Sequence, residues 1–238
     1  MDLSRIADNV SAVRERIRLA GNRSGRSCDA VKLVAVSKYA AKEDGMIDAL
    51  TAAGCRDLGE SRPQSLIEKA TWFSGQELNL NWHLIGSLQK NKVRRVLPFV
   101  SLIHSLDSIS LIETVDRIVA EESLPPVNGL LEVNISGDAT KQGFRAQELA
   151  TALEIIAGLR NIRIRGLMCM SGLHSTDDER RAEFAATRIL AEKLAADCPD
   201  NCLMHELSMG MSDDFPIAIE EGATLVRIGS SLYQDVLF

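Results

Sequence analysis

A lysine follows an apolar run near the start of the chain. Residues 31–37 read VKLVAVS, which is typical of a buried strand, and Lys38 comes directly after them. Lysine is among the residues least often buried. One explanation is a stem that packs on a rim while the ammonium stays in water. The other is chemical, because a desolvated lysine amine is nucleophilic and forms a Schiff base with an aldehyde.

Two short loops near the other end of the chain have the composition of anion-binding turns. Residues 207–214 read LSMGMSDD, and residues 226–231 read VRIGSS. Glycines let backbone N–H groups approach an anion, and serine hydroxyls add further donors. A ligand with both a phosphate and an aldehyde is therefore expected, and pyridoxal 5′-phosphate (PLP) fits that description. The candidate phosphate-binding residues are Ser208, Met209, Gly210, Ser212, Gly229 and Ser230.

Arg227 lies within the predicted last strand, two residues before Gly229. On an outward face it would form a surface ion pair of little consequence. On an inward face it would donate to the pyridine nitrogen of PLP, and the partner of that atom tunes the cofactor. Because arginine is always charged, it would keep the nitrogen unprotonated and make PLP a poorer electron sink.

Strand-like and helix-like runs alternate along the whole chain, which is the pattern of a parallel sheet. Eight such units in roughly 250 residues predict a single α/β domain, a (β/α)8 or TIM-type barrel. The alternative is an open, doubly wound sheet. An amphipathic helix over 2–20 is expected to replace the helix that normally follows the last strand. Strands are expected at 31–37, 55–58, 82–85, 101–105, 129–135, 162–169, 203–207 and 224–228, with helices near 41–53, 60–72, 89–96, 108–122, 146–158, 177–196 and 213–221.

The composition is that of an ordinary globular protein, and we expect one domain over residues 1–238. Hydrophobic residues make up 45% of the chain and charged residues 25%. The net charge of -6 provides no basic surface for nucleic acid and disfavours an anionic membrane. No apolar run is long enough to span a bilayer, and the N-terminus does not read as a signal peptide. The five scattered cysteines predict reduced thiols in the cytoplasm and no metal site.

The chain resembles the pyridoxal phosphate homeostasis proteins through nearly its whole length. The resemblance implies a fold-type III, single-domain barrel like the N-terminal domain of alanine racemase, with PLP as a Schiff base on Lys38 and Arg227 at the ring nitrogen. It also implies a pocket-lining place for His83. The family usually has asparagine where Ser61 stands, so a contact near the ring hydroxyl is expected to be shorter or water-mediated. The motifs that carry the resemblance are LVAVSK (33–38), LGES (58–61), HLIGSLQKNK (83–92), IHSLDS (103–108), VNISGDATKQG (133–143), RGLMCMSG (165–172) and LSMGMSDDFPIAIEEGATLVRIGSS (207–231).

The resemblance further implies a function as a carrier that buffers PLP and regulates vitamin B6 homeostasis without robust catalysis. We expect a cytoplasmic monomer with PLP-dependent apo-enzymes as transient recipients of the cofactor. Lys141 is either a solvated loop lysine or a second amine that accepts PLP transiently. Nothing can be carried over from the family to the ending LYQDVLF.

Two enzymes are the alternatives to a carrier. A PLP-dependent racemase needs acid–base groups on both faces of its substrate. We expect none here, because the chain ends seven residues after Ser231 without a second domain and strand alternation points Tyr39 away from the cofactor. A barrel aldolase would attack a sugar phosphate with Lys38 directly and would carry no yellow cofactor.

Overall fold

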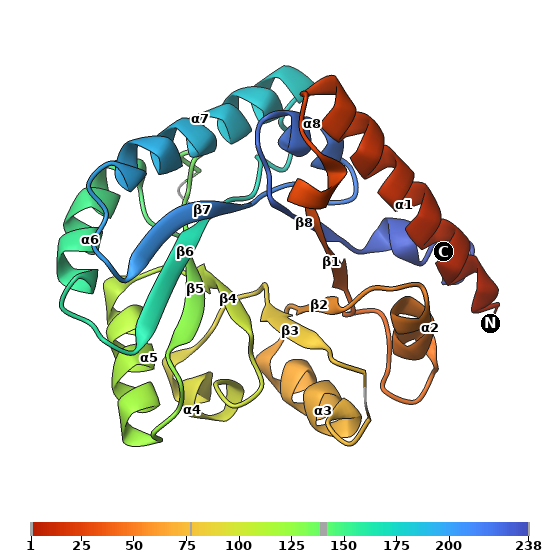
Figure 1. Ribbon diagram of the computed structural model, residues 1–238, viewed down its shortest axis with the longest axis horizontal. Coiled ribbons are helices and arrows are strands. Elements are labelled where there is room, and N and C mark those ends of the chain that lie inside the picture. Colours follow the sequence, from red (N-terminus) through yellow and green to blue (C-terminus); the bar gives the residue numbers. More distant parts are fainter. Residues whose placement is uncertain (1, 77, 139–141, 238) are drawn as a thin grey trace.

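The computed structural model describes residues 2–76, 78–138 and 142–237. Within these residues, eight parallel strands close into a barrel in chain order, with helices around the outside (Figure 1). The predicted (β/α)8 barrel is confirmed, and the open sheet is excluded. The strands are β1 (Lys32–Val36), β2 (Asp57–Glu60), β3 (Asn81–Leu84), β4 (Leu102–Leu106), β5 (Val127–Glu132), β6 (Ile162–Met168), β7 (Cys202–Ser208) and β8 (Leu225–Ile228).

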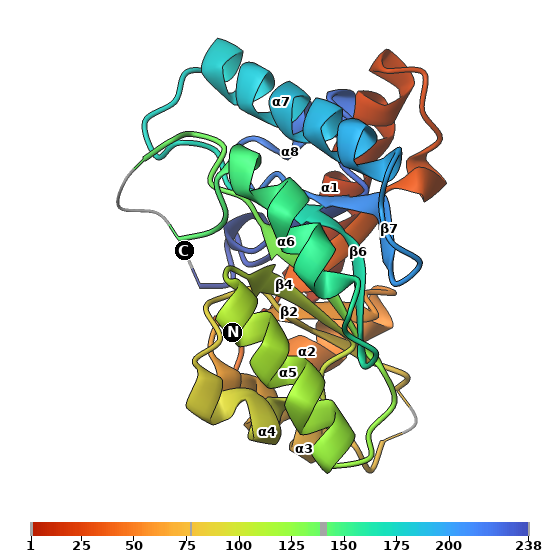
Figure 2. The same cartoon turned by 90° about the vertical axis from the view of Figure 1, so that its left-hand side faces the viewer.

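The helices cover the outer face of the strands (Figures 1 and 2). The first helix lies beside the last one and beside the C-terminal turn, which is the place expected for it (Figure 1). In the described part of the chain, no helix is both long and apolar enough to cross a membrane. The helices are α1 (Ser4–Arg23), α2 (Met46–Ala52), α3 (Pro63–Phe73), α4 (Val93–Val96), α5 (Ile109–Glu121), α6 (Leu149–Ile156), α7 (Asp177–Ala195) and α8 (Phe215–Glu220), with the 3-10 turns η1 (Cys28–Ala30), η2 (Lys90–Lys92), η3 (Ala146–Glu148) and η4 (Ser230–Leu232).

Local signals explain why two helices begin later than predicted. Helix α2 starts after Gly45, whose φ of 76° is left-handed and therefore suits glycine. The Asp44 carboxylate accepts the Met46 N–H at 2.9 Å and so satisfies one free donor of the first turn. Helix α3 begins at Pro63, because proline lacks an N–H and is best tolerated at the first helical position.

The barrel interior is divided into layers because successive inward side chains on a strand lie two residues apart. One apolar layer is separate from the larger core that lies between strands and helices. Polar side chains of β3, β4, β7 and β8, also buried, share the interior with it. This packing fixes which residues of each strand reach either end of the barrel. The apolar layer consists of Val34, Leu102, Leu130, Met168 and Leu225, with Ile85 against it.

Candidate cofactor-binding site

A pocket of about 230 Å³ opens where β1, β2, β7 and β8 end. In a barrel of this type the carboxyl ends of the strands form the functional face. Residues from both ends of the sequence meet here because β1 pairs with β8 in the closed barrel. The sequence-predicted residues that line the pocket are Lys38, Ser61, Ser212, Arg227, Gly229 and Ser230.

The backbone just before Lys38 is held by a buried polar cluster. The Ser37 hydroxyl donates to Glu60 Oε1 at 2.9 Å, and the Lys69 ammonium donates to the Ser37 carbonyl at 2.7 Å. Lys69 also forms an ion pair with Glu60, and the two residues are only 7% and 1% exposed. Lys38 itself is exposed, and its Nζ lies 4.9 Å from the centroid of the Tyr39 ring. The amine is therefore accessible to a ligand while its main chain is fixed, and it is not desolvated in this structure.

Tyr39 lies in this pocket, so the expectation that it points away is wrong. Strand β1 ends at Val36, and the regular alternation of side chains does not continue beyond that residue. The Tyr39 ring packs edge-on against Tyr233, with centroids 5.5 Å apart. The Tyr233 hydroxyl in turn donates to the Val36 carbonyl at 3.1 Å. The aromatic pair thus fixes one wall beside Lys38.

Arg227 brings a buried cation to the floor of the pocket. Its Nη1 donates to Ser208 Oγ at 2.5 Å, and its Nη2 donates to the Cys169 carbonyl at 3.0 Å. Burial lowers the pKa of this guanidinium, yet it stays charged because arginine is not deprotonated in proteins. Two hydrogen bonds from different nitrogens fix the plane of the group, as a specific contact with a ligand requires.

The two loops predicted to bind phosphate are joined to each other. The Gly229 N–H donates to Ser212 Oγ at 3.3 Å. Buried Asp214 braces the first loop, because its carboxylate accepts the Met211 N–H at 2.6 Å and the Ser171 hydroxyl at 2.6 Å. The brace was not foreseen, since an aspartate at the start of a helix is ordinary in sequence.

Three residues assigned to the phosphate site do not line this pocket, and β7 continues to Ser208, one residue beyond its predicted end. Ser208 is fully buried and faces Arg227 inside the barrel. Met209 is buried in the larger apolar core. Gly210 is needed for close packing, because a Cβ there would lie 2.6 Å from the Cβ of Ala218 on α8. None of the three is among the residues that line the pocket, and their contacts with phosphate stay a prediction.

His83 is also outside this pocket. It is 3% exposed and borders a different pocket, of about 360 Å³, together with Lys32 and Asp57 at the amino ends of the strands. Its Nε2 lies 3.0 Å from Asp57 Oδ1. The residue of this segment that reaches the strand-end pocket is Ile85, which comes directly after β3 and two positions after His83. The pocket-lining role expected for His83 is corrected accordingly.

The sequence reading missed the apolar and acidic part of the pocket. Met170 is 37% exposed and lines the pocket. Of these lining residues, only Ile85 could have been predicted from the sequence, because it lies two residues after His83 and strand alternation puts the two on one face. Lys141 lies outside the described residues. The additional lining residues are Val36, Tyr39, Ile85, Met170 and Asp213, and Met211 of the first predicted loop also lines the pocket.

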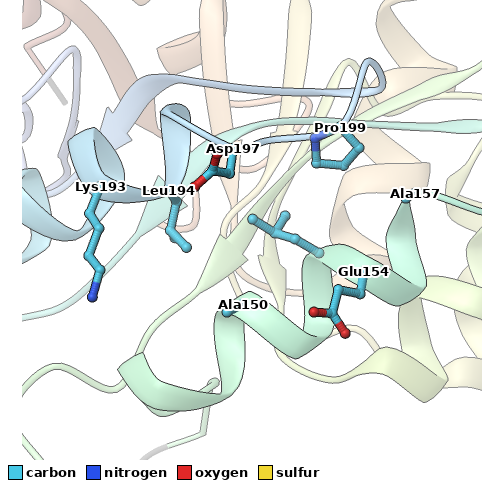
Figure 3. A pocket seen from close by; sticks show the side chains of 8 residues that line it. Ala150, Glu154, Ala157, Lys193, Leu194, Asp197 and Pro199 are labelled. Atoms are coloured by element: carbon cyan, nitrogen blue, oxygen red, sulfur yellow. The ribbon is translucent and has the colours of Figure 1, made fainter.

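A larger hollow of about 470 Å³ lies between α6 and α7 and lacks these features (Figure 3). No strand-end loop contributes to it, so it gathers no set of hydroxyls and backbone N–H groups. Its lining is mixed and mostly aliphatic, and it belongs to the outer helical layer. The lining residues are Ala150, Leu153, Glu154, Ala157, Lys193, Leu194, Asp197 and Pro199.

The barrel and its strand-end pocket define a class of protein, the alanine racemase N-terminal domain. The profile of that family matches residues 1–236. Within this class, the chain belongs to the pyridoxal phosphate homeostasis protein family, as the sequence motifs predicted. It is 39% identical to the pyridoxal phosphate homeostasis protein of Pseudomonas aeruginosa over 231 residues, which are 97% of this chain and 96% of that protein. The corresponding protein of Escherichia coli K12 is 36% identical over 232 residues, 96% of this chain and 95% of that protein.

A solved structure of a family member carries the cofactor. PipY of Synechococcus elongatus with PLP bound is 34% identical to this chain, with a TM-score of 0.83 over 96% of this chain and 99% of that one. Alanine racemase of Corynebacterium glutamicum, 17% identical with a TM-score of 0.63 over 97% of this chain and 60% of that one, shares the fold alone.

Proposed function

We propose that this protein binds PLP in the pocket at the carboxyl ends of its strands and serves as an exchangeable store of the cofactor in vitamin B6 homeostasis. The observation that carries the proposal is the convergence of an amine, a buried guanidinium and a glycine–serine anion loop on one pocket. PipY, which has the same barrel, was solved with PLP bound.

The residues present match each part of PLP. When bound, PLP supplies an aldehyde that condenses with an amine and a pyridine ring that can withdraw electrons. Lys38 is the amine for the aldehyde, and Arg227 is the donor for the ring nitrogen. Ser212 and Ser230, which line the pocket, would offer hydroxyls to the phosphate, and Ser61 would offer one to the ring hydroxyl. The aliphatic side chains of the pocket provide an apolar surface for the ring.

We propose storage and delivery to PLP-dependent apo-enzymes, without robust turnover, because a permanently charged Arg227 leaves the ring nitrogen no proton. Tyr39 is the specific observation that favours the racemase alternative, since its ring lines the pocket beside Lys38.

We propose that the protein is a cytoplasmic monomer. The cytoplasmic location is supported by four free thiols among the described residues, Cys55, Cys169, Cys198 and Cys202.

The carrier proposal predicts that the loaded protein exchanges PLP but turns over amino acids negligibly. Loaded protein is incubated with L- and D-amino acids while racemisation, decarboxylation and transamination are followed. In parallel, activation of an apo-enzyme is timed against the same amount of free PLP. Multiple turnover that disappears in both Lys38→Ala and Tyr39→Phe would establish the racemase instead.

Arg227 is expected to tune PLP more than to hold it. Arg227→Gln keeps an amide donor near Ser208 but removes the charge, so we expect the absorption spectrum of bound PLP and its pH response to shift. We expect its Kd to rise no more than about tenfold, the equivalent of one hydrogen bond. Gly229→Val, which fills the anion loop, should raise the Kd further. Equal losses in the two variants would identify Arg227 as a phosphate ligand.

A further inference from the structure

A line of buried polar side chains crosses the barrel interior from the cofactor pocket to the opposite end. Arg227 Nη1 lies 2.5 Å from Ser208 Oγ, which lies 2.8 Å from His104 Nδ1. His104 Nε2 lies 2.9 Å from His83 Nδ1, and His83 Nε2 lies 3.0 Å from Asp57 Oδ1. Each residue comes from a different strand, β8, β7, β4, β3 and β2. Arg227, Ser208, His104 and His83 are at most 4% exposed.

The two ends of this line fix the direction of every hydrogen bond in it. A guanidinium can only donate, and an ionised carboxylate can only accept. Ser208 Oγ accepts a hydrogen bond from Arg227. The Ser208 hydroxyl therefore donates its own proton to His104 Nδ1, the other partner of that oxygen. His104 then carries its proton on Nε2 and donates it to His83.

The same logic fixes the second ring. His83 accepts at Nδ1, carries its proton on Nε2 and donates it to Asp57. Both rings are therefore neutral. For His104, burial holds its pKa well below the usual value, and the charges of Arg227 and Lys32 act in the same direction. In the reverse direction, the Ser208 hydroxyl would be buried without an acceptor, which is costly.

We propose that Asp57, His83, His104 and Ser208 form a one-way hydrogen-bond chain that positions Arg227 against the ring nitrogen of PLP. The proposal rests on the proposed function only for the identity of the ligand that Arg227 meets. Within this hydrogen-bond chain, His104 and Ser208 act by positioning Arg227, since neither lines the cofactor pocket. Aligned hydrogen bonds polarise one another, so a change at Asp57 is expected to reach Arg227.

The chain orients Arg227 and does not deliver protons to it. Arginine stays protonated, so no proton can pass through it to the ring. The other groups that act on the Arg227 charge are Glu132, Asp214 and Cys169. None of them appears in the hydrogen bonds that join Arg227 to Asp57. At the other end of the hydrogen-bond chain, Asp57 lines the pocket at the amino ends of the strands. Its Oδ1 lies 3.9 Å from Lys32 Nζ.

The first test needs no PLP. In ligand-free protein with ¹⁵N-labelled histidine, NMR should find the proton of both His83 and His104 on Nε2 at neutral pH. Ser208→Ala should change the Nδ1 signal of His104, which loses its donor. A proton on Nδ1 of His104 in the wild type would overturn the proposed direction of the chain.

The second test compares two carboxylates at the same end of the barrel. Glu206 also lines the amino-end pocket, but its carboxylate accepts from Thr224 and is not in the chain. We expect Ser208→Ala to shift the absorption maximum of bound PLP and to raise its Kd up to about tenfold. Asp57→Asn should give a smaller shift in the same direction, and Glu206→Gln should give none.

The outcomes distinguish failure of the proposed hydrogen-bond chain from failure of PLP binding. Equal spectral shifts in Asp57→Asn and Glu206→Gln would show that only long-range charge acts, and would overturn the chain. If the wild type binds no PLP, the proposed function fails, while the histidine tautomers in ligand-free protein still decide whether the chain exists. The wild-type NMR result also stands if a variant does not fold.

Discussion

We expect Lys38→Ala to abolish covalent capture of PLP and to raise its Kd by about a hundredfold or more, an effect of about 2.7 kcal/mol. Lys38 is the lysine that lines the pocket together with Arg227 and the Gly229–Ser230 turn in the described structure. Without its amine, the aldehyde has no nucleophile at that position. Absorption titration and equilibrium dialysis with PLP measure the two losses.

Lys42→Ala is the matched control. Lys42 lies four residues further on, where its ammonium is 5.0 Å from the centroid of the Trp72 ring, and it is not among the residues that line the pocket. We expect wild-type affinity and spectrum in this variant. Retention of the bound-PLP spectrum in Lys38→Ala would contradict the assignment.

Lys69→Met is expected to destabilise the fold by about 3–5 kcal/mol, since it leaves the Glu60 carboxylate buried without its cation. Glu60 is 1% exposed, and the same ammonium also donates to the Ser37 carbonyl. Because Ser37 precedes Lys38, PLP affinity should fall as well. Urea unfolding followed by circular dichroism measures the free energy of unfolding.

Two further variants test whether burial is the cause. Glu60→Leu combined with Lys69→Met removes both charges and should recover most of the lost stability. Arg117→Met removes an exposed i,i+4 partner of Glu121, and we expect it to cost no more than about 0.5 kcal/mol. A double variant as unstable as Lys69→Met would show that packing, and not the unpaired charge, is responsible.

The barrel could be predicted because its strands are apolar runs that recur between amphipathic helices. The boundaries were less accurate, since they depend on partners in space. Strand β2 was expected over 55–58 but runs from Asp57 to Glu60, where it pairs with Asn81 to Leu84 of β3. Such pairing is not encoded in the local pattern of hydrophobicity.

The site could be predicted where a residue follows a strand end, as Lys38, Ser61 and Gly229 do, because barrel topology brings strand ends together. Ser208 was misplaced because β7 ends one residue later than predicted. His83 was misplaced because it faces the amino ends of the strands, two residues before the position that reaches the strand-end pocket. The hydrogen-bond chain that joins Asp57 to Arg227 was not foreseen, because its members are scattered over five strands and meet only in the closed barrel.

Reduction of the PLP-loaded protein with borohydride, followed by proteolysis and mass spectrometry, tests the central claim most directly. Borohydride makes the link between the aldehyde and its amine permanent, so the labelled peptide identifies the lysine. The account predicts one pyridoxyl group per chain, on Lys38. A label found mainly on Lys32, Lys69 or Lys141, or an unlabelled protein, would contradict it.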